Sequence, residues 1–428
     1  MTSCVHAQLP GEYAPDEMRC GIVWELMRPP RARGVLPGAP RAAIAAGVTP
    51  GVWQSAQDMP FAGFWAQPDA AAALFGADGV LIAGGEDGRR LPTDLSALLT
   101  PSTGVWTSTP PLRQARRLHT LTRLENGQIL AVGGLGAGPG APATGLATAE
   151  LYDPGSGGWV PVGGLSEGRF SHSATALKDG RLLVAGGCTA RDDHSLRTLR
   201  SAELYDPGSR AWTPVRAPMT DARFGHPTVR FDDGRVLLVG GALAVGRGSY
   251  AALGHCEVFH PADATWSPTG TLATARKGHQ ATLLLDGDVL VTGGDMRGFR
   301  DEDWAYDPYS QWTTERYDPD AGTWSVDADM PWGRSHHRAV RLGSGAVLVL
   351  GGTDDSSLAV GYQNAVLYDP GARAWSDELP MTEGRWAPAA VALNDGRVLV
   401  LGGLTHSGAA APVPGEDQVT ATTETYTP

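Results

Sequence analysis

Short apolar segments that each end in Gly-Gly recur seven times along this chain. They return every 49 to 58 residues, and no long amphipathic helical window interrupts them. Apolar runs this short, bounded by turn residues, predict β-strands rather than helices. A regular repeat of this length predicts an architecture built from seven copies of one structural unit. The first glycines of the seven pairs are Gly84, Gly133, Gly186, Gly240, Gly293, Gly351 and Gly402.

Each repeat contains four strand signals in the same order. The first is an Arg-x-x-His segment such as Arg169–His172, and a turn such as Asp179-Gly180 leads into the Gly-Gly strand. Glycine supplies the positive φ that a tight hairpin needs. A third strand reads Glu-Leu-Tyr-Asp-Pro at Glu150–Pro154. The fourth strand carries one of six tryptophans, which are Trp106, Trp159, Trp212, Trp266, Trp324 and Trp375. Four strands per repeat predict the blades of a β-propeller.

The two ends of the chain are predicted to complete one blade together. Only six tryptophan strands follow the seven Gly-Gly strands, and the chain stops at Glu424–Pro428, which is a third-strand pattern. The missing tryptophan stands near the other end, at Trp53. We therefore expect Trp53 to supply the outer strand of the last blade and so to close the ring, which leaves only short edges. Residues 1–50 match no repeat and are expected to form an irregular N-terminal arm, either a solvated tail or a lid.

The combined Gly-Gly, Tyr-Asp-Pro and Trp pattern resembles the kelch superfamily. The resemblance covers residues 51–428 and implies an all-β, seven-bladed kelch β-propeller whose first strands are innermost. Galactose oxidase and glyoxal oxidase resemble this fold, and one of their inner strands reads Arg-x-Tyr-His, with the His as a copper ligand. Arg169 and His172 match that motif, but Ser171 stands where the Tyr would be. The resemblance thus implies a ligand position without the Tyr–Cys radical cofactor.

Five blades carry a histidine 14 residues before their Gly-Gly pair. These are His119, His172, His226, His279 and His337. Blade 7 has Pro388 at this position, and blade 1 has a residue near Ala71. Imidazole-only sites suit copper, iron, zinc or nickel. We expect three or four of these rings to hold one transition-metal ion in the central channel, copper first, with iron or zinc as alternatives. The other interpretations are structural packing and a metal-free acid/base role; no catalytic residue is identified.

Six blades carry an arginine three residues before the histidine position. These are Arg116, Arg169, Arg223, Arg276, Arg334 and Arg385. At about 3.3 Å per residue they would lie roughly 10 Å nearer the channel mouth, where six guanidiniums favour a carboxylate or phosphate ligand. The alternative is ion pairing with loop acids between blades. In the long aromatic loop Asp295–Thr314, Trp304 and Tyr306 are further candidates for binding substrate, unless that loop only packs on its neighbour.

Composition limits the partners and the compartment. The formal net charge of −12 argues against nucleic acid or an anionic membrane as a partner. No apolar run reaches the length of a membrane span, and the N-terminus lacks the pattern of a signal peptide. The four cysteines form no CxxC pair, which fits free thiols in a reducing compartment. We therefore predict a cytoplasmic monomer.

Two functions are compatible with these observations. The first is a metal-dependent enzyme, oxidative and of copper or iron class, that acts on a small polar or anionic substrate at the channel mouth, for example in specialised metabolism. The second is a non-catalytic binding module that captures an acidic peptide or small ligand through the arginine-lined mouth, as kelch adaptors do. The fold alone does not separate them, because propellers support both roles.

Overall fold

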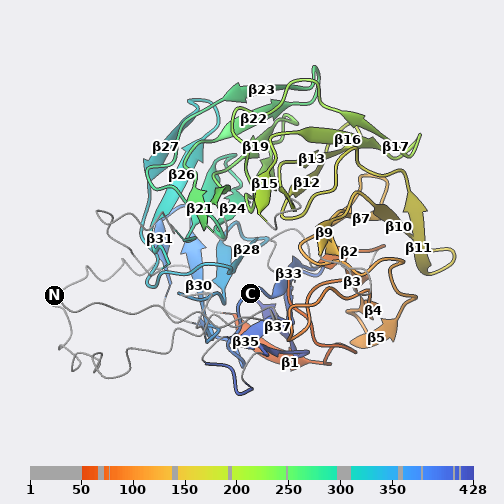
Figure 1. The fold of residues 1–428 in the computed structure, drawn as a ribbon. Helices are drawn as coiled ribbons and strands as arrows, with labels where there is room; N and C mark the ends of the chain where they lie inside the picture. Colours follow the sequence, from red (N-terminus) through yellow and green to blue (C-terminus); the bar gives the residue numbers. More distant parts are fainter. Residues whose placement is uncertain are drawn as a thin grey trace, which may run out of the picture. The chain divides into compact units, whose positions relative to one another are not determined.

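The computed structural model describes residues 51–428 apart from ten short gaps. The gaps are residues 66–71, 77, 137–142, 191–194, 247–248, 296–309, 355–359, 377–378, 408–409 and 414–415. All described residues belong to one unit, which spans residues 42–428. That unit is a seven-bladed β-propeller of antiparallel sheets (Figure 1). The described part contains no helix that is long and apolar enough to cross a membrane.

The first four blades, numbered in the order of their Gly-Gly pairs, each contain four strands that run in sequence from the axis outwards. Blade 1 has β2 (Ala72–Leu74), β3 (Val80–Ala83), β4 (Ser96–Thr100) and β5 (Val105–Ser108). Blade 2 has β6 (Thr120–Arg123), β7 (Ile129–Val132), β10 (Ala149–Asp153) and β11 (Gly158–Val162). Blade 3 has β12 (Ser173–Ala176), β13 (Leu182–Ala185), β16 (Ala202–Asp206) and β17 (Ala211–Pro214). Blade 4 has β18 (Thr228–Arg230), β19 (Val236–Leu238), β22 (Glu257–His260) and β23 (Thr265–Pro268).

The last three blades follow the same order. Blade 5 has β24 (Gln280–Leu283), β25 (Val289–Thr292), β26 (Thr314–Asp318) and β27 (Thr323–Val326). Blade 6 has β28 (Arg338–Arg341), β29 (Val347–Leu350), β30 (Asn364–Asp369) and an outer edge split into β31 (Ala374–Trp375) and β32 (Leu379–Pro380). Blade 7 has β33 (Ala389–Ala392), β34 (Val398–Leu401), β37 (Thr423–Thr427) and β1 (Val52–Ala56).

The ring closes as the sequence predicts. Strand β1 pairs antiparallel with β37, which places Trp53 opposite Tyr426 with ring centroids 5.1 Å apart. The same third-strand tyrosine and fourth-strand tryptophan meet in other blades, for example Tyr205 and Trp212 at 5.0 Å. The innermost strands also contact one another all the way round, from β2 through β6, β12, β18, β24, β28 and β33 back to β2.

The hydrophobic core lies in the seams between successive blades. One buried cluster, for instance, joins Leu130 and Val132 of blade 2 to Leu182 and Val184 of blade 3. The second strand of every blade is almost completely buried, because it is covered by a neighbouring sheet on both faces. Any side chain of the repeat that points sideways therefore enters a tightly packed interface rather than the central channel.

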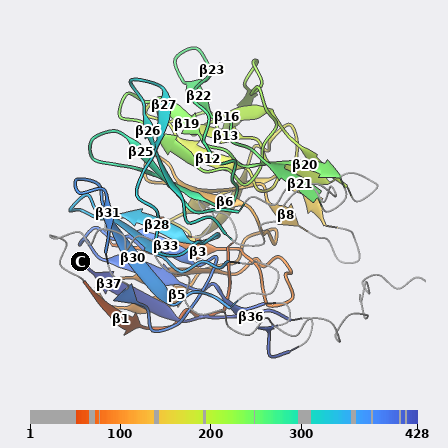
Figure 2. The same ribbon diagram turned by 90° about the vertical axis from the view of Figure 1, so that its left-hand side faces the viewer.

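The alternating strand directions divide the connections between two faces. The loops after the Gly-Gly pairs and the connections to the next inner strand lie on one face, which we call the loop face. The turns between the first two and the last two strands lie on the other, the turn face. Among the described residues, four loops of the loop face form hairpins. These are β8 (Leu135–Gly136) with β9 (Thr144–Gly145), β14 (Cys188–Ala190) with β15 (Leu196–Thr198), β20 (Ala242–Gly246) with β21 (Ser249–Ala252), and β35 (Leu404–His406) with β36 (Gln418–Val419). Figure 2 shows β8, β20, β21 and β36 on the side away from the C-terminus.

Candidate functional site

One hydrogen bond of the Gly-Gly pairs is repeated in all seven seams. The second glycine donates its N–H to the carbonyl of the residue at the arginine position of the next blade, over 2.8–3.0 Å, as from Gly134 to Arg169. Both glycines of each pair have positive φ, which other residues adopt only with strain. A Cβ on the first glycine, Gly133, would lie 2.6 Å from the carbonyl oxygen of Arg169. Glycine is therefore required where one blade contacts the next.

The five predicted histidines occupy these seams. Each imidazole lies over the first glycine of the preceding blade, so a Cβ on that glycine would come within 2.6–3.2 Å of the imidazole Cε1. The residue before each histidine has positive φ, such as 53° at Ser171 and 51° at His336. This left-handed residue breaks the alternation of the strand just before β12 and β28, and the following imidazole turns into the seam. All five histidines are at most 1% exposed.

Hydroxyl groups of the preceding blade pair with three of these rings. The Nε2 atom of His172 lies 3.0 Å from the Thr120 hydroxyl, and that of His226 lies 2.9 Å from the Ser173 hydroxyl. His337 is bonded in the same way to Thr292, over 2.8 Å. The Nε2 atom of each of these three rings is thus already in a hydrogen bond across a seam.

The seam environment keeps the imidazoles uncharged. Burial, assisted by the neighbouring Arg116 guanidinium, lowers the pKa of His119 to about 3. Burial and Arg276 lower the pKa of His279 to about 3 as well. The pKa values of His172, His226 and His337 are also well below the ordinary value of His, again chiefly because of burial. These side chains therefore remain neutral at physiological pH.

The predicted metal ring is not formed. Although all five histidines belong to the described residues, no three His, Cys, Asp or Glu side chains among those residues come together as a metal site. Each ring lies in its own seam, with an inner strand between it and the next. Arg338, which is 4% exposed, donates from the inner strand of blade 6 to the main-chain oxygen of Trp65 in blade 1, over 2.6 Å. Because blade 7 lies between blades 6 and 1, this contact joins blades that are not neighbours in the ring. The described imidazoles thus do not converge on one point, and metal binding by them stays a prediction.

Blade 1 fills its seam differently, and the repeat pattern did not predict this. The predicted position near Ala71 lies outside the described residues. Instead, the Trp65 ring contacts the first glycine of blade 7, where a Cβ on Gly402 would lie 2.9 Å from the Trp65 Cζ3 atom. Trp65 is 2% exposed. An indole thus takes the place that an imidazole takes in five other seams. The unusual spacing of this repeat was the available signal.

The six predicted arginines are completely buried, at 0% exposed. Arg169 shows the shared arrangement: its Nη1 donates to the carbonyls of Gly186 and Ser201, and its Nη2 donates to the Glu203 carboxylate over 3.1 Å. Five of the six pair with the third-strand glutamate of their own blade, and Arg334 pairs with Asn364 over 2.9 Å instead. The five glutamates are Glu150, Glu203, Glu257, Glu315 and Glu424.

The glutamates also hold the chain that leads into each inner strand. Glu203, for example, accepts the main-chain N–H of Ser166, and Glu257 accepts those of Thr220 and Asp221. Each arginine therefore links the second and third strands of its own blade. The acids nearest to five of them are third-strand glutamates, and loop acids contribute as well, because Arg223 lies 3.9 Å from Asp221 and Arg385 lies 3.4 Å from Glu383. Anion binding by these arginines stays a prediction, and their complete burial counts against it.

The loop face carries most of the exposed apolar side chains. Of eleven large hydrophobic residues that are exposed among the described ones, seven lie on it, namely Leu91, Leu95, Leu196, Trp312, Trp332, Val360 and Val413. Trp312 and Trp332 are 51% and 55% exposed and belong to adjoining segments, since Met330 donates its N–H to the Trp312 carbonyl over 2.8 Å. The predicted substrate residues Trp304 and Tyr306 lie outside the described residues.

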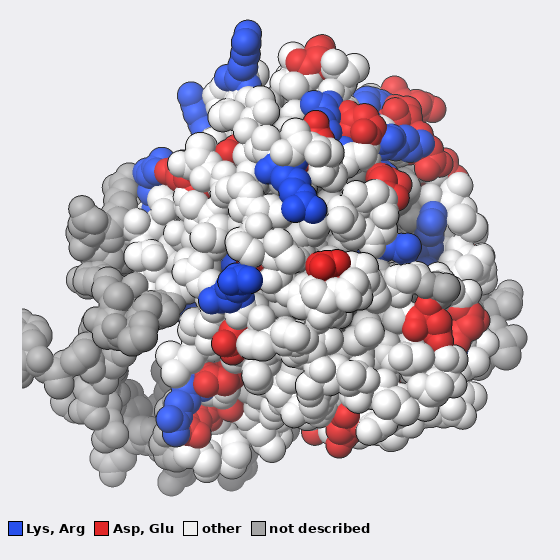
Figure 3. All heavy atoms as spheres, turned by 90° about the vertical axis from the view of Figure 1, so that its right-hand side faces the viewer, with Lys and Arg blue, Asp and Glu red and all other residues white. Residues whose placement is uncertain are grey.

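Charged side chains near the channel mouth are paired. The Arg117 guanidinium bonds to Glu86 over 2.7 Å, and the Lys277 ammonium lies 3.3 Å from Asp295 and 4.2 Å from the centroid of the Tyr250 ring. On the side of the molecule that Figure 3 shows, which is the edge of the ring rather than the mouth, basic and acidic side chains are likewise interspersed. A mouth of this kind offers apolar contacts and neutralised charges rather than a strong anion site.

Comparisons with known proteins agree with the repeat. The family model for the Kelch motif matches residues 169–219. Human Kelch-like protein 34 is 29% identical over 246 residues, which is 57% of this chain and 35% of that protein. Kelch-like protein 36 of Bos taurus is 27% identical over 245 residues, 56% of this chain and 37% of that protein. The chain therefore spans little more than a third of the length of these relatives.

Two solved structures share the fold. A fungal alcohol oxidase of the AA5 family, in complex with copper, superposes with a TM-score of 0.67 at 18% identity, covering 89% of this chain and 77% of that one. YjhT superposes with a TM-score of 0.53 at 14% identity, covering 86% of this chain and 95% of that one. At these identities the likeness concerns the fold alone. The sevenfold motif, the closed ring of blades and these matches together identify the chain as a member of the kelch-repeat β-propeller superfamily.

Proposed function

We propose that this protein is a non-catalytic binding module that holds a protein or peptide partner against its loop face. The observation that carries the proposal is the exposure of Trp312 and Trp332 in adjoining segments of that face. Tryptophan is enriched among the residues that dominate protein–protein binding energy, because it buries a large rigid surface at small entropic cost. Five further exposed apolar residues lie on the same face, so the partner would contact hydrophobic side chains surrounded by paired charges.

The repeated residues of the inner strands support this division of labour. The histidines and arginines are the chemically most capable side chains of the repeat, and both sets are taken up in packing and hydrogen bonding between strands. The residues at repeated positions thus stabilise the propeller, and the loops, which differ between blades, would recognise the partner. This is the usual arrangement when binding residues are carried by loops on a rigid scaffold.

The experiment is affinity capture from a lysate of the source cells with purified protein and matched variants. The Trp312→Ala, Trp332→Ala double variant is expected to lose a partner that wild-type protein retains. Val326→Ala is the control, because Val326 is 69% exposed but lies on an outer strand. Retention of every partner by the double variant, with an unchanged melting temperature, would reject the loop face as the binding surface.

A metal-dependent oxidoreductase is the competing function. It is supported by the fold shared with a copper-containing alcohol oxidase, whereas the seam positions of the histidines count against it. Elemental analysis of protein purified without chelator separates the two. Our proposal expects far less than one equivalent of copper, iron or zinc; one equivalent that disappears in a His172→Phe, His226→Phe variant would overturn it. Cytoplasmic location and a monomeric state stay predictions.

A further inference from the structure

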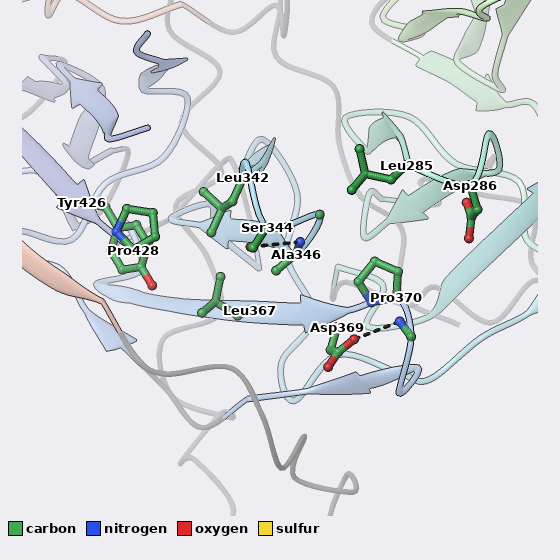
Figure 4. Close-up of a pocket in the computed structure, with 12 residues that line it drawn as sticks. Leu285, Asp286, Leu342, Ser344, Ala346, Leu367, Asp369, Pro370, Tyr426 and Pro428 are labelled. Atoms are coloured by element: carbon green, nitrogen blue, oxygen red, sulfur yellow. Dashed lines mark hydrogen bonds between the residues drawn. The ribbon is translucent and has the colours of Figure 1, made fainter. Parts of the chain in front are cut away.

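The turn face has a groove of about 560 Å³ beneath blade 6. Figure 4 shows its components: Leu342 and Leu367 lie between the Asp369 turn on one side and Tyr426 with Pro428 on the other. The groove thus lies beneath blade 6 and reaches both neighbouring blades, because Leu285 and Asp286 of blade 5 also line it. It lies on the opposite side of the propeller from the loop face, so it takes no part in the function proposed above.

The groove exists because one turn position holds a small residue. In every blade the turn between the first two strands is closed by the same hydrogen bond, from Leu177 to the Arg181 carbonyl in blade 3 and from Leu342 to the Ala346 carbonyl in blade 6. The residues at this closing position are Gly79, Gln128, Arg181, Arg235, Asp288, Ala346 and Arg397. A second groove, of about 330 Å³, lies beneath blade 1, where the position holds Gly79. Both grooves therefore coincide with the two smallest side chains of the set.

An arginine fills the equivalent space in another seam. In blade 3, Arg181 extends from the turn and donates its Nη2 to the carbonyl of Pro261 in blade 4, over 2.9 Å. The strand registers make Pro428 the counterpart of Pro261, because Phe259 and Tyr426 occupy the same position opposite the second strand. In the seam after blade 6, Pro428 therefore lies where its carbonyl could accept a hydrogen bond from an arginine. The turn of blade 6, however, carries Ala346 where blade 3 carries Arg181.

A second seam repeats the pattern with an arginine from a different strand. Arg316 of β26 in blade 5 donates its Nη1 to the carbonyl of Pro370 in blade 6, over 3.4 Å, while its other nitrogens bond to Asp286 and Asp288. Two different sequence positions thus supply the same contact, a guanidinium on the proline carbonyl of the next blade. The shape and the main-chain acceptor of the seam select the guanidinium, rather than one fixed position of the repeat.

The walls of the blade 6 groove suit a cation with an apolar stem. Leu342, Leu367 and Ala346 present aliphatic surface, and Asp369 places a carboxylate in the lining. The Asp286 carboxylate also lines the groove but is already paired with Arg316. The Oδ1 atom of Asp369 accepts the N–H of Gly371 over 2.8 Å. An arginine side chain combines a stem of methylene groups with a planar cation that donates to several acceptors at once.

We propose that this groove binds an arginine side chain of a partner protein, which takes the place that Arg181 takes in the seam between blades 3 and 4. The stem of the incoming arginine packs on Leu342 and Leu367. Its guanidinium donates to acceptors of the Asp369 and Pro428 walls. The site is specific for a guanidinium, because a neutral group of the same shape gains the apolar contacts but not the attraction of the Asp369 carboxylate.

The test uses saturation-transfer NMR with Nα-acetyl-arginine methylamide as the probe and the corresponding citrulline amide as its neutral isostere. The full-length protein is expected to bind the arginine probe in the millimolar range and the citrulline probe about tenfold more weakly. Ala346→Arg is expected to abolish binding, because the new side chain fills the groove. Gln128→Arg, at the same turn position of blade 2, is the matched control and should bind the probe like wild type.

Asp369→Asn gives a second test that leaves the groove its shape. Its amide oxygen can still accept the Gly371 N–H, so the turn is kept while the charge is lost. We expect it to weaken the arginine probe several-fold and to leave the citrulline probe unchanged. Equal binding of the two probes to wild-type protein, or undiminished binding to Ala346→Arg, would overturn the proposal. The Trp312→Ala, Trp332→Ala variant should bind the probe normally, so failure of the groove site and failure of the loop-face function remain distinguishable.

Discussion

The seam between blades 7 and 1 and the five histidine seams solve the same packing problem with different side chains. In both, a flat ring lies on the first glycine of a Gly-Gly pair: His119 on Gly84 in one case and Trp65 on Gly402 in the other. In both, the second glycine donates to the carbonyl of the next blade, over 3.0 Å to Arg116 and 2.9 Å to Gly63. The main-chain contact is therefore constant while the ring and the arginine position vary.

This difference between the seams indicates the structural role of the repeated histidine. Trp65 has no imidazole, so it cannot bind a metal in the way predicted for the five histidines. Its ring nevertheless occupies the same space in its seam, and the ring of blades is closed there. The seam thus requires a planar, thin side chain beside a glycine. An imidazole also forms a hydrogen bond with a neighbouring hydroxyl, as between His172 and Thr120. Packing alone is therefore enough to explain why His is repeated in five blades.

Truncation should have the largest effect, because it removes the outer strand of blade 7 altogether. Deleting residues 1–50 is expected to leave a cooperatively folding propeller, whereas deleting residues 1–60 removes β1 and Met59, which is 4% exposed in the core. The second truncation exposes the long edge of β37 and the Tyr426 ring. Circular dichroism melts should show one sharp transition for the first protein and none for the second. Indistinguishable melts would mean that β1 does not close the ring.

Loss of one of the six buried arginines should be the next largest effect. Arg169→Ala leaves the buried Glu203 carboxylate unpaired, and we expect a cost of about 3–5 kcal/mol in the free energy of unfolding. Arg397→Ala is the control, because its pair with Asp395 is 31% and 50% exposed and should contribute about 0–1 kcal/mol. Urea denaturation measures both. If Arg169→Ala is as stable as the control, the arginine is available for a ligand after all.

Adding a methyl group in the seam should lower the free energy of unfolding by less than the loss of a buried arginine does. The size of the decrease separates the steric clash in the seam from backbone strain. Gly133 and Gly157 have φ of +59° and +66°, so alanine at either position carries a similar strain of about 1–2 kcal/mol. Only at Gly133 does the new Cβ meet the Arg169 carbonyl at 2.6 Å and the His172 ring at 2.9 Å; nothing lies within 4 Å of the one at Gly157. Gly133→Ala should therefore lose about 1–3 kcal/mol more than Gly157→Ala in urea denaturation. Equal losses would show that the seam accommodates the clash.

The smallest expected effect is on the pH dependence of stability. The folded pKa values of His119 and His279 are about 3, below the value of about 6.5 in the unfolded chain. Between these values the unfolded chain binds protons that the folded protein does not, so stability is complete above pH 6.5 and falls as the pH drops. Each such histidine contributes at most about 1.4 kcal/mol per pH unit.

His119→Phe sharpens this prediction, because it keeps a flat ring over Gly84 and removes one titrating group. Urea denaturation between about pH 7 and pH 5 should give a shallower slope than wild type, by close to one proton. A variant slope identical to that of wild type would mean that His119 is protonated in the folded protein and is not a neutral packing group.

The sequence by itself determined the architecture. Gly-Gly, the third-strand Tyr-Asp-Pro and the fourth-strand Trp are short-range patterns, and seven copies leave no other arrangement of strands. Counting the tryptophans also identified Trp53 as the closing strand, which the pairing of β1 with β37 confirms. These inferences succeeded because strand order and turn type depend on residues near one another in the chain.

The direction of the repeated side chains and the residues that they contact depend on the tertiary structure. The direction of each imidazole follows from a left-handed residue before it and from the neighbouring blade's glycine, which is 39 residues earlier for His172. Arg169 and Glu203 both belong to repeated motifs, yet nothing in the linear pattern pairs them. The grooves arise likewise, because a small residue such as Ala346 matters only against the walls of the next blade. Contacts across a seam join distant segments, and a local pattern does not encode them.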